Sequence, residues 1–243
     1  MKTNKIIRLS LIALIVTLTS CSVDTIRISS NDPITYRTVN AEDYSEIEIS
    51  NDIEAYITFS DTEESIEIEA NNDLHEYIIV SIDNDVLSIK MKGNINIKGN
   101  ATHNVYIKTN AIKSFKASSD SKIYLENTLT ENNVKISTTS DAFFTGEIDV
   151  NFLEVNASSD ANVDLYGYAD TINVHIASDA KLGDYDLEVN HLEMNMSSDA
   201  KAYLTVTETI DIKGSSDAIL YYKGDAVITD VDLSSDAKVR NRN

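Results

Sequence analysis

The stretch HLEMNMSSDAKAYL, residues 191–204, sets the phrase Ser-Ser-Asp-Ala between two segments in which apolar and polar residues alternate. Alternation with a period of two is typical of a β-strand with one buried face, and polar phrases between such segments are typical of turns. Related phrases recur, and their aspartates are Asp120, Asp141, Asp160, Asp179, Asp199, Asp217 and Asp236. The gaps are 21, 19, 19, 20, 18 and 19 residues. This period predicts a solenoid, in which each coil buries its apolar face against its neighbours.

The direction of the turn residues is predicted from parity within each coil. In the quoted stretch the apolar residues and Ser198 occupy even positions, whereas Asp199 occupies an odd one. Because side chains alternate between faces along an extended chain, we expect Ser198 and its equivalents to point inward and the aspartates outward. Ala follows the aspartate in every phrase except one, where Ser121 does, and suits a tight corner. The sequence therefore predicts an all-β solenoid whose coils stack about 4.8 Å apart.

The first twenty residues differ from the rest of the chain. Three basic residues precede the apolar run LIALIVTLTS, residues 11–20, and Cys21 follows. This order is typical of an export signal, and the apolar run is too short to span a bilayer. Leu18-Thr19-Ser20-Cys21 resembles a bacterial lipobox, which implies cleavage before Cys21 and its acylation. We expect a signal peptide over residues 1–20, a lipidated Cys21 with a tether over residues 21–35, and attachment to the outer membrane through the lipid.

Residues 36–243 are expected to form one domain, with a β-rich N-terminal segment over residues 36–99 and repeat coils over residues 100–243. In the first segment alternating runs end at Asn51-Asp52, Asn72-Asp73 and Asn84-Asp85, pairs that tolerate the left-handed backbone of tight turns. The formal net charge of −20 repels nucleic acid, so we expect no nucleic-acid partner. Cys21 is the only cysteine, which leaves no disulfide or thiolate metal site for the fold.

The lipobox, the β-rich N-terminal segment and the repeated turn resemble the head GIN domain family of auto-transporter adhesin heads, exported proteins abundant in Bacteroidota. The resemblance covers roughly residues 36–240. The turn of that family is usually Gly-Ser-Gly-Asp, whereas here Gly214 alone opens a phrase with glycine. The resemblance implies a right-handed parallel β-helix similar to the pectin-lyase-like folds and a role in adhesion. It provides no catalytic residues.

The aspartate column, defined as the seven turn aspartates named above, is the first candidate site. Carboxylates about 5 Å apart could each accept hydrogen bonds within their own turn. Alternatively, they could together bind Ca²⁺ or another hard cation. The glycine-rich loops of known calcium-binding repeats are missing from these phrases, which favours the turn role. The four histidines share no repeat position, so we expect no histidine metal site. No other cofactor is expected.

Two further sets of residues are candidates. Tyr203 and Tyr221 have the parity opposite to the buried residues, so we expect exposed rings that stack on sugars or anchor a protein, or simply β-favouring surface residues. Asp24-Thr25-Ile26 and Asp170-Thr171-Ile172 are similar to the O-glycan acceptor pattern of Bacteroidota, which makes Thr25 and Thr171 candidate glycosylation sites.

These observations favour a lipid-anchored cell-envelope protein, not an enzyme, whose rigid solenoid presents a surface for adhesion or for a glycan or envelope-protein ligand. Two alternatives stay open: a polysaccharide-active enzyme of pectin-lyase-like fold, and a structural protein of envelope assembly. A groove with converging acids and bases would favour the enzyme, whereas a flat or aromatic face would favour the adhesin. The oligomeric state stays open.

Overall fold

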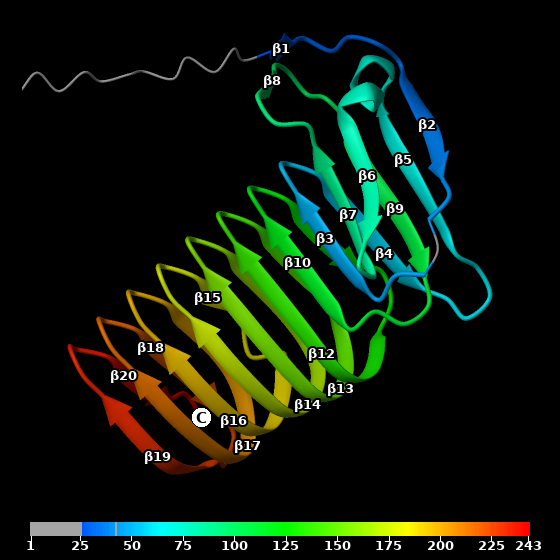
Figure 1. Ribbon diagram of the computed structural model, residues 1–243. Coiled ribbons are helices and arrows are strands. Elements are labelled where there is room, and N and C mark those ends of the chain that lie inside the picture. The colour runs from blue at the N-terminus through cyan, green and yellow to red at the C-terminus, as the bar shows by residue number, and fades with distance from the viewer. Residues whose placement is uncertain (1–25, 42) are drawn as a thin grey trace, which may run out of the picture.

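The computed structural model describes residues 26–41 and 43–243. They form strands and one short 3₁₀ helix, η1 (Asn72–Tyr77) (Figure 1). The strands are β1 (Ile26–Ile28), β2 (Ile34–Val39), β3 (Glu46–Ser50), β4 (Glu54–Phe59), β5 (Ser65–Asn71), β6 (Ile78–Asp83), β7 (Val86–Met91), β8 (Ile95–Ile97), β9 (His103–Thr109), β10 (Ser114–Ser118), β11 (Lys122–Leu125), β12 (Leu129–Thr139), β13 (Phe143–Ser158), β14 (Asn162–Ile176), β15 (Lys181–Leu182), β16 (Leu187–Met196), β17 (Lys201–Gly214), β18 (Ile219–Lys223), β19 (Val227–Leu233) and β20 (Lys238–Asn241).

The predicted β-solenoid is confirmed and has about seven turns. Each coil contributes the segment before its sharp turn to one sheet, here sheet I, and the segment after the turn to a second sheet, here sheet II. Successive coils pair in parallel, as β10 does with β12 in sheet I and β11 with β13 in sheet II. Long strands such as β13 and β14 bend from sheet II into sheet I, which produces the row of arches in Figure 1.

Each sharp corner is a two-residue turn with both central residues in the left-handed region. Ser198 and Asp199 have φ values of 53° and 61°, and the Ala200 N–H donates to the Ser197 carbonyl at 3.3 Å. Positive φ at both positions defines a type I′ turn. The prediction that Ser198 and its equivalents point inward is wrong, because alternation between faces holds only for extended backbone. Both Ser198 and Asp199 are exposed, the latter as expected, and Ala200 takes the buried corner.

Backbone hydrogen bonds link the turns from coil to coil. The Asp179 N–H donates to the Ser198 carbonyl at 2.9 Å, and the other turns repeat this contact at similar distances. The Asn51-Asp52 turn belongs to the same column, because the Asp52 N–H donates to the Ser119 carbonyl at 3.0 Å. The first coil is therefore β3–β4, which lies inside the segment expected to precede the coils. The glycine-free turns are thus held by their neighbours as well as by their own sequence.

Apolar side chains from both sheets fill the solenoid, and the corner positions are small where the sheets converge. Phe115 and Phe144 are fully buried, with ring centroids 5.4 Å apart. Ser121, the exception to alanine at the corner, is also fully buried. Its hydroxyl donates to the Ile49 carbonyl at 2.9 Å and accepts from the Ser118 N–H at 3.0 Å. The hydroxyl thus bridges two adjacent coils, which explains why this corner is not alanine.

The N-terminal end of the solenoid is closed by antiparallel strands. β6 pairs with β7 through a hairpin whose tip is Asn84-Asp85, and β5 lies between β2 and β9. Asn72-Asp73 begins η1 and forms no type I′ turn. β1 pairs with β8, so the expected tether over residues 21–35 is part of a two-stranded sheet from Ile26 to Ile28. No helix within the described residues is long and apolar enough to cross a membrane.

Candidate functional site

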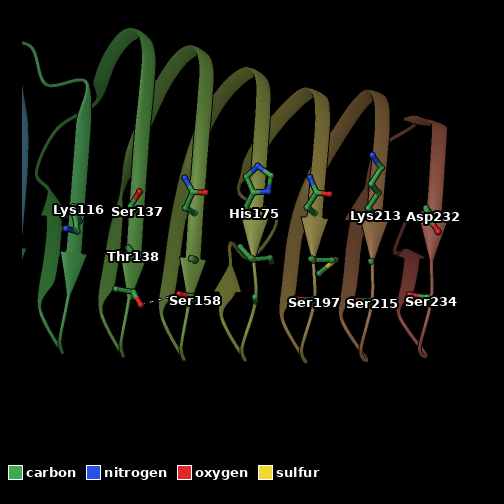
Figure 2. A pocket seen from close by; sticks show the side chains of 18 residues that line it. Lys116, Ser137, Thr138, Ser158, His175, Ser197, Lys213, Ser215, Asp232 and Ser234 are labelled. Carbon is green, nitrogen blue, oxygen red and sulfur yellow. Dashed lines mark hydrogen bonds between the residues drawn. The ribbon is translucent and has the colours of Figure 1, made fainter.

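The outer face of sheet I carries a polar groove of about 690 Å³ that crosses the strands. Figure 2 shows two rows of side chains along it, one four residues before each turn aspartate and one two residues before it. In-register pairing of successive coils aligns each row. The first row consists of Lys116, Ser137, Asn156, His175, Asn195, Lys213 and Asp232. The second row consists mainly of small residues: Thr139, Ser158, Ala177, Ser197, Ser215 and Ser234.

The chemistry of this groove is that of hydroxyls, amides and a few charges, together with the apolar residues Ala157, Ile176 and Met196, which lie between the two rows along their strands. The Thr139 and Ser158 hydroxyls lie 3.2 Å apart, and the Asn156 amide donates to the Glu154 carboxylate at 2.8 Å. A Lys135 ammonium 2.8 Å from Glu154, together with the Asn156 amide, lowers the pKa of that carboxyl group. Asp232 is the one carboxylate among the described residues that line the groove. The groove is therefore suited to hydrogen bonding with a neutral polar ligand.

A second hollow of about 640 Å³ continues the groove toward the N-terminal coils. Lys116 and Ser137 line both hollows, so the two form one surface of sheet I. The second hollow is more charged, because Glu48 and Lys116 form an ion pair of 2.9 Å beside it. Sequence reasoning missed this entire surface. The signal available was the position four residues before each turn aspartate, which is polar in every coil.

Tyr203 and Tyr221 lie on the outer face of sheet II, as their parity predicted, but they are half-buried. Their ring centroids are 5.0 Å apart with an interplanar angle of 11°, so each ring covers a face of the other. The Arg242 guanidinium lies 4.9 Å from the centroid of Tyr221, and the Lys223 ammonium lies 4.5 Å from that of Tyr185. Aromatic or cationic neighbours therefore lie against the rings of both Tyr203 and Tyr221.

A second tyrosine stack, which the sequence analysis missed, lies on the same face nearer the N-terminus. Tyr56 stacks on Tyr106 at 5.2 Å and on Tyr124 at 5.0 Å. Burial, with the charge of Glu54 and the hydrogen bond of 3.2 Å to it, raises the pKa of Tyr56 to about 12. Tyr56 and Tyr124 follow their turn aspartates by four residues, as Tyr203 and Tyr221 do. Alignment of the Asn51-Asp52 turn with the serine phrases would have found them.

The aspartate column is exposed along its whole length, and the backbone N–H groups of its members before Asp236 donate the coil-to-coil hydrogen bonds. Among the described residues, no three His, Cys, Asp or Glu side chains are grouped so that they could hold a metal ion. Calcium binding by the column stays a prediction.

The remaining candidates are the modification sites. Thr171 is half-buried on β14, in register with Phe152 and His191. Cys21 and Thr25 lie outside the described residues, so lipidation and glycosylation stay predictions.

Comparison with solved structures shows the same fold in several bacterial proteins. A protein described as a "putative adhesin" from Bacteroides fragilis has a TM-score of 0.80 at 17% identity, covering 88% of this chain and 100% of its own. A "putative adhesin" from Parabacteroides merdae has a TM-score of 0.73 at 17% identity, covering 90% and 100%. A "putative lipid binding protein" from Parabacteroides distasonis has a TM-score of 0.73 at 14% identity, covering 89% and 100%. At these identities the likeness establishes the fold.

A search of curated proteins found no significant match. The sequence profile of a family described as "Putative auto-transporter adhesin, head GIN domain" matches residues 43–226. This match spans most of the solenoid and most of the segment that closes its N-terminal end. The chain therefore belongs to the head GIN domain family of adhesin-like proteins.

Proposed function

We propose that the protein is a lipid-anchored protein of the cell envelope that binds a glycan along the polar groove of sheet I. The observation that carries the proposal is the groove, in which polar side chains repeat once per coil, about 4.8 Å apart, over successive parallel strands. A linear polymer with repeated hydroxyl groups matches such a repeated surface. Membership in an adhesin-like family supports a binding role.

The lining of the groove suits sugar hydroxyls, which both donate and accept hydrogen bonds. Asn156 and Asn195 provide amides with both capacities, and the serine row provides hydroxyls with both. Their strands are held in register on both sides, so little conformational freedom is lost on binding. The tyrosine stacks are less suited to sugars, because Tyr203 and Tyr221 cover each other's faces. We therefore place the glycan in the groove.

A glycan array probed with residues 21–243 carrying Cys21→Ala tests this proposal. We expect binding to a defined set of glycans, with affinity lowered about thirtyfold by the double substitution Asn156→Ala and Asn195→Ala, since two lost hydrogen bonds contribute about 1 kcal/mol each. Asn162→Ala, on the outer face of sheet II, is the matched control and should leave the affinity unchanged. Binding that survives the double substitution would contradict the proposed groove.

The same protein tests the alternative of a polysaccharide-active enzyme. Glycoside hydrolysis usually requires two carboxyl groups across the scissile bond. Within the described lining of the groove, Asp232 is the one carboxylate. We expect a bound glycan to be recovered with its chain length unchanged, whereas shorter products that disappear with Asp232→Asn would favour the enzyme.

The proposal of a lipid anchor depends on the lipobox that ends at Cys21. Two or more acyl chains attach a protein stably to a membrane, whereas one chain gives marginal binding. We expect the native protein to fractionate with the outer membrane and the Cys21→Ala variant to appear in the soluble fraction. Equal membrane association of the two proteins would refute the lipid anchor and leave the glycan proposal intact.

A further inference from the structure

The last coil of the solenoid leaves interior side chains open to solvent. Ile228, Val231 and Leu233 on β19 have exposed fractions of 37%, 52% and 36%. They align with the buried positions of the preceding coil, where Ile210 and Ile212 are fully buried. In repeat proteins a terminal repeat is usually polar on its outer side, because that side faces water. Here the side chains that point between the two sheets of the terminal coil are apolar, although no further coil in the described part of the chain covers them.

The backbone of this coil is also available for pairing. β19 pairs with β17 and β20 pairs with β18, and no other strand in the described part of the chain pairs with either. Figure 1 shows both strands at the end of the solenoid. Each thus presents an edge of N–H and C=O groups, which is a template for pairing with another strand. An apolar surface flanked by two open strand edges has the features of an interface.

The outward side chains of the two strands carry opposite charges. On β19 they include Asp230 and Asp232, and on β20 they include Lys238 and Arg240. None of these four belongs to an ion pair within the described residues, where the lysine–carboxylate pairs involve residues 48–154. The acidic edge of β19 is therefore complementary in charge to the basic edge of β20, whereas two copies of the same edge would repel each other.

We propose that this open end binds the same end of a second copy of this chain, so that two solenoids join tail to tail. The chain reverses direction at Ser235-Asp236, so β19 and β20 run in opposite directions. A two-fold axis parallel to the strands would bring β19 of one copy beside β20 of the other in antiparallel orientation. This arrangement pairs the acidic edge with the basic edge twice and buries Ile228, Val231 and Leu233 of both copies.

The other two-fold arrangement is disfavoured by charge. An axis perpendicular to the strands would place β19 beside β19, and Asp230 and Asp232 of the two copies would repel each other. The observed charges therefore select both the partner and its orientation. The proposal is independent of glycan binding, because its readout is the mass of the particle.

Sedimentation of residues 21–243 carrying Cys21→Ala tests the proposal without association through the lipid. We expect a mass twice that of one chain at micromolar concentration. One variant carries Asp230→Lys and Asp232→Lys, and a second carries Lys238→Glu and Arg240→Glu. We expect each variant alone to have half the wild-type mass, because like charges then face each other. These side chains are exposed, and circular dichroism verifies that both variants keep the fold.

Mixing the two variants is the decisive step. In the proposed dimer every contact between the two variants joins opposite charges, so the mixture should regain the mass of two chains. A monomeric wild-type protein, or a dimer that resists both charge reversals, would overturn the proposal. So would a mixture of the two variants that stays monomeric, because both edges of the proposed dimer would then join opposite charges.

Discussion

The two ends of the solenoid differ in how their apolar interior residues are covered. At the N-terminal end, antiparallel strands and η1 cover the first coil, and Leu74 and Ile68 are fully buried there. At the C-terminal end, the last coil has the same apolar interior positions, yet Val231 and Leu233 stay exposed. A parallel solenoid can add coils without limit, so its ends must be closed by a different structure or by another molecule. Within the described residues no structure closes the C-terminal end, so we expect a partner to bind there.

The largest expected effect is the difference in unfolding free energy lost on truncating two leucines, one at each end of the solenoid. Leu74→Ala should lower the free energy of unfolding by about 2–5 kcal/mol, because it leaves a cavity under η1. Leu233→Ala should cost less than about 1 kcal/mol in a monomer, because the side chain is 36% exposed. Urea unfolding in the background of Asp230→Lys and Asp232→Lys measures both without dimerisation. Equal losses at the two sites in this monomeric background would show that Leu233 is covered within the single chain and that the C-terminal end is not open.

A smaller effect is expected at the corner that joins the first two coils. Ser121→Ala removes the hydroxyl that bridges the Ile49 carbonyl and the Ser118 N–H, leaving both buried groups without it. We expect a loss of about 1–3 kcal/mol in the free energy of unfolding. Ser197→Ala, at a half-buried serine beside a later turn, is the control and should change stability little. If Ser121→Ala proves neutral, the bridge adds nothing to the closed end.

The type I′ turns recur from coil to coil along the solenoid, and a substitution in one of them should increase the free energy of unfolding slightly. Ser198 has a φ of 53°, which costs an L-residue about 1–2 kcal/mol, whereas glycine loses about 0.5–1 kcal/mol through backbone entropy. Ser198→Gly should therefore raise the free energy of unfolding by about 0.5 kcal/mol. Ser197→Gly, outside the left-handed region, should lower it. Thermal unfolding of the two variants compares them, and a destabilising Ser198→Gly would mean that the serine side chain stabilises the turn.

The solenoid could be predicted from sequence because one phrase recurs at a nearly fixed period, and a period is independent of tertiary detail. The facing of Ser198 could not be predicted from parity, since two left-handed residues interrupt the alternation on which parity depends. The first coil was missed because its turn is Asn51-Asp52 and the next coil, β10–β11, follows only after the closing segment, residues 60–110. The tyrosines of both stacks could have been found from their shared position, four residues after a turn aspartate. That their rings cover one another could not, because it depends on the orientation of each ring. The open end likewise requires knowledge of which strands pair.

The smallest expected effect concerns the pH dependence of the closed end. Burial of Glu69 on β5 raises its pKa, but hydrogen bonds from Asn104, Tyr36 and Tyr106 at 3.0, 2.9 and 2.9 Å outweigh burial and lower it. Because the pKa is lower in the folded state, the carboxylate stabilises the fold above its ordinary pKa of 4.5, and this stabilisation is lost as the pH falls through the folded value.

Glu69→Gln should lower the free energy of unfolding by less than about 1 kcal/mol at neutral pH and should flatten its fall toward about pH 4. Glu67→Gln, on the exposed side of the same strand, is the control and should keep the wild-type pH dependence. Unfolding free energies at both pH values measure the difference. An identical pH dependence in the wild type and Glu69→Gln would show that these three hydrogen bonds do not stabilise the closed end, which would then depend on its buried apolar residues alone.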